Sequence, residues 1–486
     1  MPVTPAHAEL VIGAARVPAG GRSGETPVLN PADQQVVGYA AVADERLVDE
    51  AASAAAAAFP AWSALPAPRR AHHLSAIASW IRSEAQRLAR GLTLEQGKPL
   101  SEATGEVAAA AAAFDHYAAE AVRVYGQTIP TDSPTLRSLV IRQPIGVTAA
   151  ITTWNYPLGL MAWKIAPALA AGCTVVAKPS EQTPLTVLDV VSAAAAGLPP
   201  GVLNSVQGPG ATTGAALAAH PLVAKISFTG GTGTGRRLLE LAARDIKSVT
   251  LELGGHSPMI VAEDAPMDLA VADGVKRSFR NAGQLCNSVN RIFVVRPVAD
   301  EFIERFVAQA AKLVVGPGLD DPEPDVGPLS NAATLARVEE HMADARRTGA
   351  KILTGGGRPD DERTRTGFYY LPTVVVGGHD MIMMREETFG PVAPITVVSD
   401  LDEAIARANS LDFGLVCYLY TRDLRTSVDG AERLEFGTVN VNSVGGGDVR
   451  FPYAGWKQSG LGVELSREGL DEYLRTKSVR IEIGYQ

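Results

Sequence analysis

Three residues of the sequence have side chains that could together process a carbonyl group: Cys286, Glu252 and Asn155. A cysteine becomes a strong nucleophile when its thiol is partly exposed and has a lowered pKa. Cys286 ends the run Asn-Ala-Gly-Gln-Leu-Cys, where glycine and polar residues indicate a tight turn that presents the thiol. Taken alone, however, a lone cysteine is more often a buried structural residue.

Glu252 and Asn155 each allow two interpretations. Glu252 lies in the apolar run Leu-Glu-Leu-Gly-Gly-His, and burial would raise its pKa toward that of a general base. It could instead pair with a surface lysine such as Lys247. Asn155, in Thr-Trp-Asn-Tyr-Pro, follows an expected strand and precedes an expected helix. Its amide could donate to a developing oxyanion, or its side chain could cap the helix.

A glycine-rich turn covers residues 228–235, with the sequence Phe-Thr-Gly-Gly-Thr-Gly-Thr-Gly. In such a turn the backbone N–H groups and the following helix N-terminus can hold a pyrophosphate. The turn lacks the usual Gly-x-Gly-x-x-Gly framing with an acidic residue about 20 positions later. A plain surface turn is therefore an equally good interpretation.

These segments must be positioned by short apolar strands that alternate with helices. In the first series we expect strands at 146–151, 174–177 and 224–228, and helices at 47–59, 72–92, 158–171 and 184–196, with a buried alanine-rich helical run at 107–114. In the second series we expect strands at 258–261 and 291–295, helices at 269–279 and 300–314, and a surface loop at 355–367. This order predicts two α/β units, each a mostly parallel sheet covered by helices on both faces.

The C-terminal segment 479–483 alternates apolar and charged residues, which predicts a half-buried strand. Segment 138–142 could pair with it or with a neighbouring subunit.

Composition narrows the class of protein. A chain of 486 residues exceeds one ordinary core, and at about 150 residues per domain it suggests two or three. The formal net charge of -9 disfavours nucleic acid as a partner. Three cysteines, without a CxxC pair or a histidine cluster, indicate a reducing compartment and no metal site. The N-terminus is a poor signal peptide and no apolar run reaches the ~20 residues of a membrane span, so we expect a cytoplasmic protein.

Taken together, the motifs resemble the aldehyde dehydrogenase superfamily, from Asn30 to beyond Lys477. They occur in family order as TWNYP at 153–157, AGCTVVAKPSEQTP at 171–184, the glycine-rich turn at 228–235, LELGGHSP at 251–258, GQLC at 283–286, EETFGPV at 386–392 and PYAGWKQSGLG at 452–462. The resemblance implies an aldehyde dehydrogenase-like α/β fold with three parts. These are a Rossmann-type NAD-binding domain (1–124 and 145–254), an α/β catalytic domain (255–446) and a small β oligomerisation flap (125–144 and 470–486) that makes a homodimer or homotetramer.

The resemblance also implies roles for the three reactive residues. Cys286 would attack the aldehyde carbon and carry a thioester, while Asn155 and the backbone N–H of Cys286 would hold the oxyanion. Glu252 would activate the water that hydrolyses the thioester. A glutamate at this position favours a free acid as product, because relatives that release product to coenzyme A usually lack it. A non-catalytic descendant of the fold would be expected to have lost one of the three.

The cofactor implied by the resemblance is NAD, with NADP as the alternative. The corresponding residues are Trp154, Lys178, Glu181, Gly230, Gly231, Gly235, Glu387 and Phe389. A carboxylate at Glu181 would bind the adenosine ribose and repel a 2′-phosphate, an effect that Lys178 could partly offset. Lys164 and Glu464 match positions implicated in proton relay, or they form a structural ion pair.

The sequence departs from the family pattern at three positions. Thr153 replaces a frequent proline, Gly231 a common serine, and Val463 a usual arginine. None of the three is the nucleophile, the base or the oxyanion donor. The expected cost therefore falls on cofactor affinity rather than on the reaction.

Arg280, six positions before Cys286, is similar to an arginine of succinate-semialdehyde dehydrogenases that binds the far carboxylate of the substrate. A guanidinium suits such an anion, although a structural ion pair is the alternative. A second arginine frequent in that subfamily is replaced here by Trp163, and Arg450 could supply the missing charge or face solvent. Tyr156, Trp163 and Tyr453 are expected to form apolar walls. The expected substrate is succinate semialdehyde, with sulfolactaldehyde or a neutral aliphatic or aromatic aldehyde as alternatives.

Overall fold

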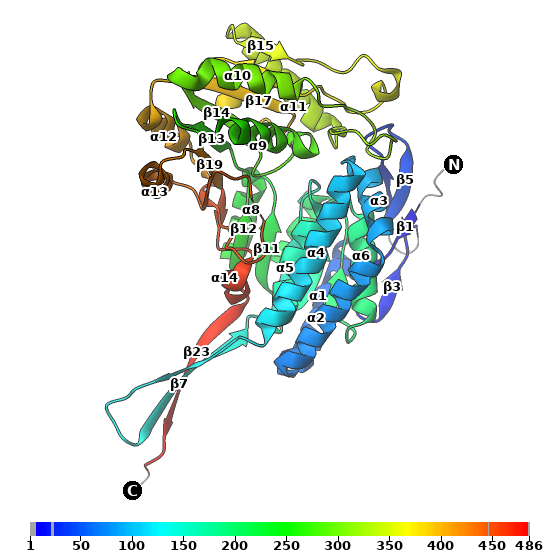
Figure 1. The fold of residues 1–486 in the computed structure, drawn as a ribbon. Coiled ribbons are helices and arrows are strands. Elements are labelled where there is room, and N and C mark those ends of the chain that lie inside the picture. The colour runs from blue at the N-terminus through cyan, green and yellow to red at the C-terminus, as the bar shows by residue number, and fades with distance from the viewer. Residues whose placement is uncertain (1–5, 21–23, 446, 485–486) are drawn as a thin grey trace.

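The computed structural model describes residues 6–20, 24–445 and 447–484. Two large sheets, each flanked by helices, lie one above the other, and a narrow three-stranded arm projects from the body (Figure 1). The first residues of the N-terminus considered as a leader, 1–5, lie outside the described residues. So do residues 21–23, residue 446 of the expected catalytic segment, and residues 485–486 of the expected flap.

The first large sheet is the one that carries Glu252. Its six strands are ordered β10 (Leu203–Ser205), β9 (Thr174–Lys178), β8 (Val147–Ile151), β11 (Val223–Thr229), β12 (Ser248–Glu252) and β22 (Gly460–Leu461). The first five are parallel, and β22 is antiparallel to β12. Alternate residues of β8 enter different cores, with Ala150 on one face and Ala149 on the other. Burial on both faces explains why these strands are rich in apolar residues and lack a regular polar face.

Helices cover both faces of this sheet. They are α1 (Glu45–Ala64), α2 (Ala67–Ser83), α3 (Ala85–Gln96), α4 (Leu100–Ala121), α5 (Pro157–Ala171), α6 (Leu185–Ala196), α7 (Ala215–Ala219) and α8 (Thr232–Ala243). The alanine-rich run at 107–114 lies in α4, as expected, and α5 ends at Gly172 in the left-handed conformation.

One expected helix is wrong, because residues 72–92 are divided between α2 and α3. The chain leaves helical geometry at Glu84, where φ is -101° and ψ is 9°. Buried leucines and isoleucines keep helical spacing on both sides of the break, from Leu74 to Leu92. Apolar periodicity alone therefore cannot detect the break.

The second large sheet has seven strands. Their order is β15 (Lys351–Thr354), β16 (Thr373–Val376), β17 (Val392–Val398), β14 (Val289–Val295), β13 (Ser257–Val261), β19 (Val416–Tyr420) and β20 (Thr438–Val441). Only β15 is antiparallel to its neighbour. Its helices are α9 (Met267–Phe279), α10 (Arg296–Ala310), α11 (Ala332–Arg347), α12 (Leu401–Asn409) and α13 (Leu424–Arg433).

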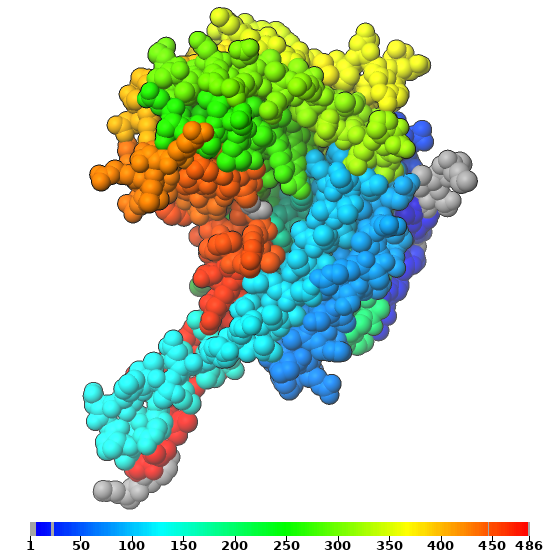
Figure 2. All heavy atoms as spheres, in the orientation of Figure 1, coloured from blue at the N-terminus to red at the C-terminus, as the bar shows by residue number. Residues whose placement is uncertain are grey.

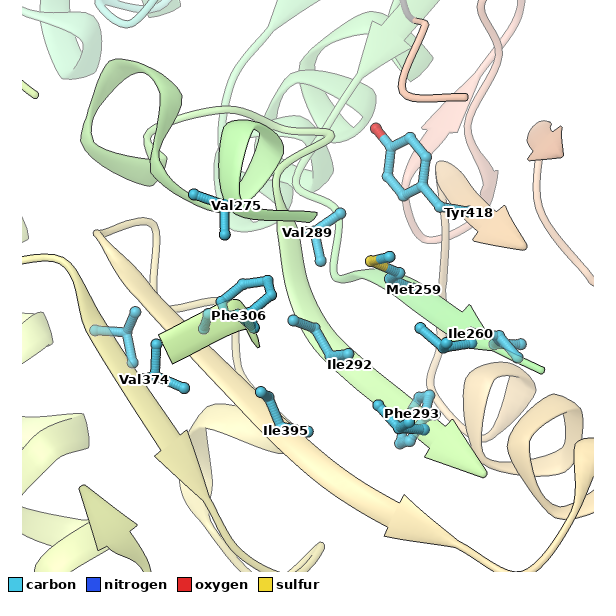
Figure 3. Packing of buried hydrophobic residues seen from close by; sticks show 14 of the residues in the cluster. Met259, Ile260, Val275, Val289, Ile292, Phe293, Phe306, Val374, Ile395 and Tyr418 are labelled. Atoms are coloured by element: carbon cyan, nitrogen blue, oxygen red, sulfur yellow. The ribbon is translucent and has the colours of Figure 1, made fainter. Parts of the chain in front are cut away.

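Figure 3 shows Phe306 of α10 packed among Ile292, Val374 and Ile395 from three neighbouring strands. The helix α10 ends earlier than the expected 314, because Val315 already forms a β-bridge with Val326. Residues 355–367 form a loop, as expected, with one short 3-10 turn at Glu362–Thr364.

Smaller elements complete the body. Near the N-terminus β1 (Ala6–Ala8), β5 (Val36–Val42) and β4 (Gly24–Leu29) form a sheet, and β2 (Leu10–Ile12) pairs with β3 (Ala15–Val17). Toward the C-terminus lie β18 (Phe413–Gly414), which pairs with β21 (Trp456–Lys457), and α14 (Ser466–Asp471). Within the described ranges no helix is long and apolar enough to cross a membrane.

The projecting arm contains β23 (Leu474–Glu482), β7 (Leu136–Pro144) and β6 (Gln127–Ile129). Val479 pairs with Leu139, so segments 138–142 and 479–483 are neighbours in the same chain. The expected half-burial of 479–483 is wrong for the single chain, in which Ile481 is 44% exposed. The arm stands clear of the body, so none of the described residues of the body covers its outer part (Figures 1 and 2).

Candidate active site

One cavity of about 440 Å³ brings together the three residues with reactive side chains. Asn155 follows β8, Glu252 is the last residue of β12, and Cys286 lies between α9 and β14. In Figure 2 the surface is hollowed where the parts that contain α4, α9 and the orange segment between β20 and α14 meet. The carboxyl ends of parallel strands from two sheets thus open onto one space, as is common for ligand sites in α/β proteins.

The turn before Cys286 has an unusual backbone. Asn281, Ala282 and Gly283 have φ values of 49°, 54° and 74°, all in the left-handed region. A Cβ added to Gly283 would lie 2.1 Å from the carbonyl oxygen of Gly390, so only glycine fits there. The expected tight turn is present, and it leaves the thiol partly exposed to the cavity.

The Cys286 thiol lies beside a hydroxyl group and a carboxylate. Its Sγ lies 3.3 Å from the Tyr453 hydroxyl oxygen. Burial and the nearby carboxylate of Glu252 raise the pKa of Cys286 well above its ordinary value. The thiol is therefore protonated at rest, and to act as a nucleophile it would need a base to remove its proton.

Glu252 is suited to be that base. Its side chain is 2% exposed, and neither carboxylate oxygen has a hydrogen-bond partner among the described residues. Burial, with a smaller contribution from the Glu464 carboxylate, raises the pKa of Glu252 to about 8. The alternative pairing with Lys247 is wrong, because the Lys247 ammonium donates to the carbonyl oxygens of His220 and Val223 at 2.7 and 2.9 Å.

The backbone carbonyl of Asn155 is fixed by hydrogen bonds, and its side-chain amide lies at the cavity. Its Nδ2 donates to the carbonyl oxygen of Gln284 at 3.0 Å, while Oδ1 has no partner among the described residues. The helix-cap alternative is wrong. The free N–H groups of Leu158 and Gly159 in α5 donate instead to Glu106 Oε1, at 2.9 and 3.1 Å.

A buried ion pair lies behind Asn155. Lys98 Nζ is 2.5 Å from Glu106 Oε2, and both side chains are fully buried. The same ammonium donates to the Asn155 carbonyl oxygen at 2.8 Å and lies 3.7 Å from the Tyr156 ring centroid. Sequence reasoning missed Lys98 and Glu106. A glutamate directly before the apolar run of α4 was the signal that could have found the pair.

The glycines of the 228–235 turn differ in the space around them, and therefore in their structural roles. A Cβ at Gly230 would lie 2.3 Å from the Phe228 ring, and one at Gly235 would lie 2.6 Å from Leu253, so both are required for packing. A Cβ at Gly231 would meet nothing within 4 Å. Gly231 caps α8 without a side-chain hydrogen bond and lines the cavity, which leaves backbone N–H groups available there.

Trp154, Glu387 and Phe389 also line the cavity. The rings of Trp154 and Phe389 meet edge to face at 5.4 Å. Glu387 Oε1 is buried without a partner among the described residues, and burial raises the pKa of Glu387 to about 8.

Lys178 and Glu181 lie outside the cavity lining. Their Nζ and Oε2 atoms are 3.7 Å apart, and Lys178 also donates to the Pro179 carbonyl oxygen at 3.1 Å. Glu181 accepts from the Gly210 N–H at 3.4 Å. Lys164 and Glu464 form a buried ion pair, which agrees with the structural alternative, although Glu464 Oε2 remains without a partner among the described residues.

Four of the five expected substrate residues line the cavity: Tyr156, Trp163, Arg280 and Tyr453. The fifth, Arg450, does not. Its side chain is 73% exposed and pairs with Asp448 at 2.6 Å, as in the solvent-facing alternative. Sequence reasoning missed Arg277, which lines the cavity one helical turn before Arg280. A cation in the last turn of a helix is ordinarily explained by the helix dipole. An arginine at this position therefore did not indicate a binding site.

No group of three or more His, Cys, Asp or Glu that could hold a metal occurs in the part of the chain that the structure describes. The reactive groups of the cavity include a thiol, two carboxylates with raised pKa values, the amide of Asn155 and three guanidinium groups. Such a set can form and hydrolyse an acyl-sulfur bond.

Comparisons with known proteins agree with this chemistry. The chain is 43% identical to a glutarate-semialdehyde dehydrogenase of Pseudomonas putida over 94% of both chains. It is 44% identical to an NADP(+) succinate-semialdehyde dehydrogenase of Escherichia coli over 93% of both, and 42% identical to a 3-sulfolactaldehyde dehydrogenase of Pseudomonas putida over 94% of both. The crystal structure of an NADP-dependent enzyme of E. coli superposes with a TM-score of 0.94 at 42% identity, covering 98% of each chain. The model of the aldehyde dehydrogenase family matches residues 19–479, and the chain belongs to that family.

Proposed function

We propose that the protein oxidises a small anionic aldehyde to a free carboxylic acid, with NAD or NADP as oxidant and Cys286 as nucleophile. One observation carries the proposal: thiol, carboxylate and amide come from three distant segments and line a single cavity. The semialdehyde substrates of the similar enzymes support the substrate class.

The first step forms a carbon–sulfur bond. Glu252 takes the thiol proton of Cys286, and the sulfur attacks the aldehyde carbon. The carbonyl oxygen becomes an oxyanion, which Asn155 Nδ2 and the Cys286 N–H stabilise. Nδ2 has two hydrogens, and its bond to Gln284 occupies one of them.

A bound nicotinamide dinucleotide supplies the hydride acceptor that turns the thiohemiacetal into a thioester. Glu252 releases the thiol proton to solvent and then accepts a proton from water, and the hydroxide attacks the thioester carbon. The carbon–sulfur bond breaks, the acid leaves, and Cys286 regains a proton. Because Glu252 has a pKa of about 8, it can both accept and return a proton near neutral pH.

The residues present fit such a cofactor. The open space over Gly231 and the uncapped start of α8 suit a pyrophosphate. The unpartnered oxygen of Glu387 suits a ribose hydroxyl, and Trp154 and Phe389 offer apolar walls. Glu181 favours NAD, because a 2′-phosphate beside its carboxylate would be repelled, and Lys178 offsets only part of that charge.

The arm supports a homo-oligomer. Ile481 of β23 and Ile483, which follows the strand, are 44% and 53% exposed, and no described residue of the body covers them. A partner subunit that buries these side chains would explain the alternating pattern of β23. Light scattering should then give a mass that is a multiple of the 50.9 kDa chain, and removal of 474–486 should reduce it.

The proposed function is tested with a kinetic panel. NADH or NADPH formation is followed with succinate semialdehyde, glutarate semialdehyde, sulfolactaldehyde, benzaldehyde and hexanal. We expect acidic aldehydes to give the highest kcat/KM, without coenzyme A. Arg280→Ala should raise KM for succinate semialdehyde by ~10- to 100-fold, because a charge-assisted hydrogen bond is lost. Absence of any aldehyde-dependent reduction of either cofactor would refute the proposal.

A further inference from the structure

Arg277 is a buried cation without an acidic partner. It lies in the last full turn of α9, is 7% exposed and lines the cavity. Arginines this deeply buried are ordinarily paired, because an isolated charge is costly in a low-dielectric interior. Among the described residues, however, no Asp or Glu lies within ion-pair distance of Arg277, whereas Arg280, another of the three arginines that line the cavity, has one.

The orientation of the Arg277 guanidinium is set by one nitrogen. Its Nε donates to the Asn287 carbonyl oxygen at 3.2 Å and to the Tyr418 hydroxyl at 3.1 Å. The Tyr418 hydroxyl donates in turn to the same carbonyl at 2.7 Å. Figure 3 shows the Tyr418 hydroxyl directed away from the neighbouring buried apolar side chains, so the triangle lies at the edge of the core.

This leaves the two terminal nitrogens of Arg277. Neither forms a hydrogen bond with any atom of the described residues, and neither is sealed in the protein as a buried atom without a partner. Because Arg277 lines the cavity, these nitrogens are available to a group inside it. Two parallel N–H donors from one planar group match the oxygens of a carboxylate or a sulfonate.

Arg280 offers a weaker charge to the cavity. Its Nε is 3.6 Å from Glu102 Oε2, and its side chain is 34% exposed. A neighbouring carboxylate offsets part of the attraction that an anion would feel, and solvent weakens that attraction further. Arg277 has neither disadvantage.

We propose that Arg277 is the principal anion-binding residue of the substrate cavity and that its terminal nitrogens bind the distal carboxylate or sulfonate of a short aldehyde. The inference rests on the proposed function and deepens it. Arg277 contacts the carbonyl of Asn287, the residue next to Cys286. An anion bound there lies close to the nucleophile, which favours a short chain between the aldehyde and the anion.

The first test compares acidic aldehydes with neutral ones of similar length. Wild type, Arg277→Gln and Arg280→Gln are assayed with succinate semialdehyde, glutarate semialdehyde, sulfolactaldehyde, butanal and pentanal. In Arg277→Gln we expect kcat/KM to fall at least ~30-fold for the preferred acidic substrate and less than ~3-fold for the neutral ones. Arg280→Gln should change the acidic-to-neutral ratio less. Comparison of the semialdehydes with sulfolactaldehyde distinguishes a carboxylate site from a sulfonate site.

A second measurement needs neither cofactor nor turnover. Iodoacetate and iodoacetamide alkylate Cys286 by the same displacement and differ mainly by one negative charge. A cation near the sulfur should raise the iodoacetate-to-iodoacetamide rate ratio above that of a free thiol, and Arg277→Gln should lower it ~10-fold. Mass spectrometry locates the adduct, and Cys286→Ala controls for the buried Cys173 and Cys417.

The variant Tyr418→Phe distinguishes a structural role of Arg277 from anion binding. It weakens the triangle of hydrogen bonds that holds the guanidinium and keeps the charge of Arg277. We expect this variant to retain the wild-type alkylation ratio and acidic-to-neutral ratio. Equal loss for charged and neutral reagents in Arg277→Gln, or a ratio that stays at the wild-type value, would overturn the inference. If wild type alkylates selectively but oxidises no aldehyde, the proposed function fails while the anion site stands.

Discussion

Two sets of buried charges lie on either side of Asn155, and they differ in one respect. Behind it, Lys98 and Glu106 satisfy each other, the start of α5 and the Asn155 backbone. In the cavity, both oxygens of Glu252 and one of Glu387 have no partner among the described residues. The comparison teaches that a satisfied buried charge fixes geometry, whereas an unsatisfied one is available for chemistry or for a ligand.

The largest expected effect removes the cavity nucleophile. Cys286→Ala should lower kcat by at least ~10³-fold, because the covalent route is lost while the neighbouring groups remain. The thermal midpoint should stay within a few degrees of wild type, since the described polar contacts of this thiol are only those with the Tyr453 hydroxyl and the Glu252 carboxylate. Steady-state kinetics and calorimetry measure the two quantities. Full activity in Cys286→Ala would refute the mechanism.

Glu252→Gln should come next, with a fall in kcat of ~10²- to 10⁴-fold. The carboxylate form of Glu252 grows as pH rises through its raised pKa of about 8, so wild-type kcat should increase between pH 7 and 9. In Glu252→Gln that rise should disappear, because glutamine does not titrate. A variant that keeps the wild-type pH profile would place the titrating group elsewhere.

On the satisfied side, Glu106→Gln should destabilise the protein, by about 3–5 kcal/mol, because Lys98 is left buried without a countercharge. Denaturant unfolding measures the loss. The double variant Lys98→Met/Glu106→Gln, which removes both charges, should recover part of it. Loss of stability in Glu106→Gln without any recovery in the double variant would mean that Glu106 acts mainly through α5.

Gly231→Ser should have the smallest effect. A Cβ at this position meets nothing within 4 Å, and the added hydroxyl can donate to a bound pyrophosphate. We expect the Kd for NAD to fall ~2- to 10-fold, measured by quenching of protein fluorescence. Gly230→Ser is the matched control, because its Cβ would collide with the Phe228 ring and should weaken binding.

The sequence predicted the parts of the molecule that follow local rules. Alternating strands and helices and the left-handed Gly172 that ends α5 are properties of short segments, and they were confirmed. The break at Glu84 and the exposure of Ile481 were not predicted. The first is invisible to apolar spacing, and the second depends on whether another subunit covers the arm.

The placement of charged side chains could not be predicted from sequence either. Arg450 and Arg277 are both close in sequence to residues that were expected in the site. Of these two arginines, however, only Arg277 lines the cavity. The difference is set by tertiary contacts, with Asp448 for Arg450 and with Tyr418 and Asn287 for Arg277. Likewise Glu106 caps α5 from another helix, a partnership that no short motif encodes.

The short strand β22 has a consequence for how the protein is made. It closes the edge of β12, where Glu252 pairs with Gly460 and the Leu253 N–H donates to Ser459 at 2.9 Å. The whole second sheet is encoded between these two strands. During synthesis on the ribosome, the edge of β12 therefore stays unpaired until nearly the entire polypeptide has emerged. Translation that stops early leaves Glu252 on a strand with an unpaired edge, which favours aggregation over partial activity.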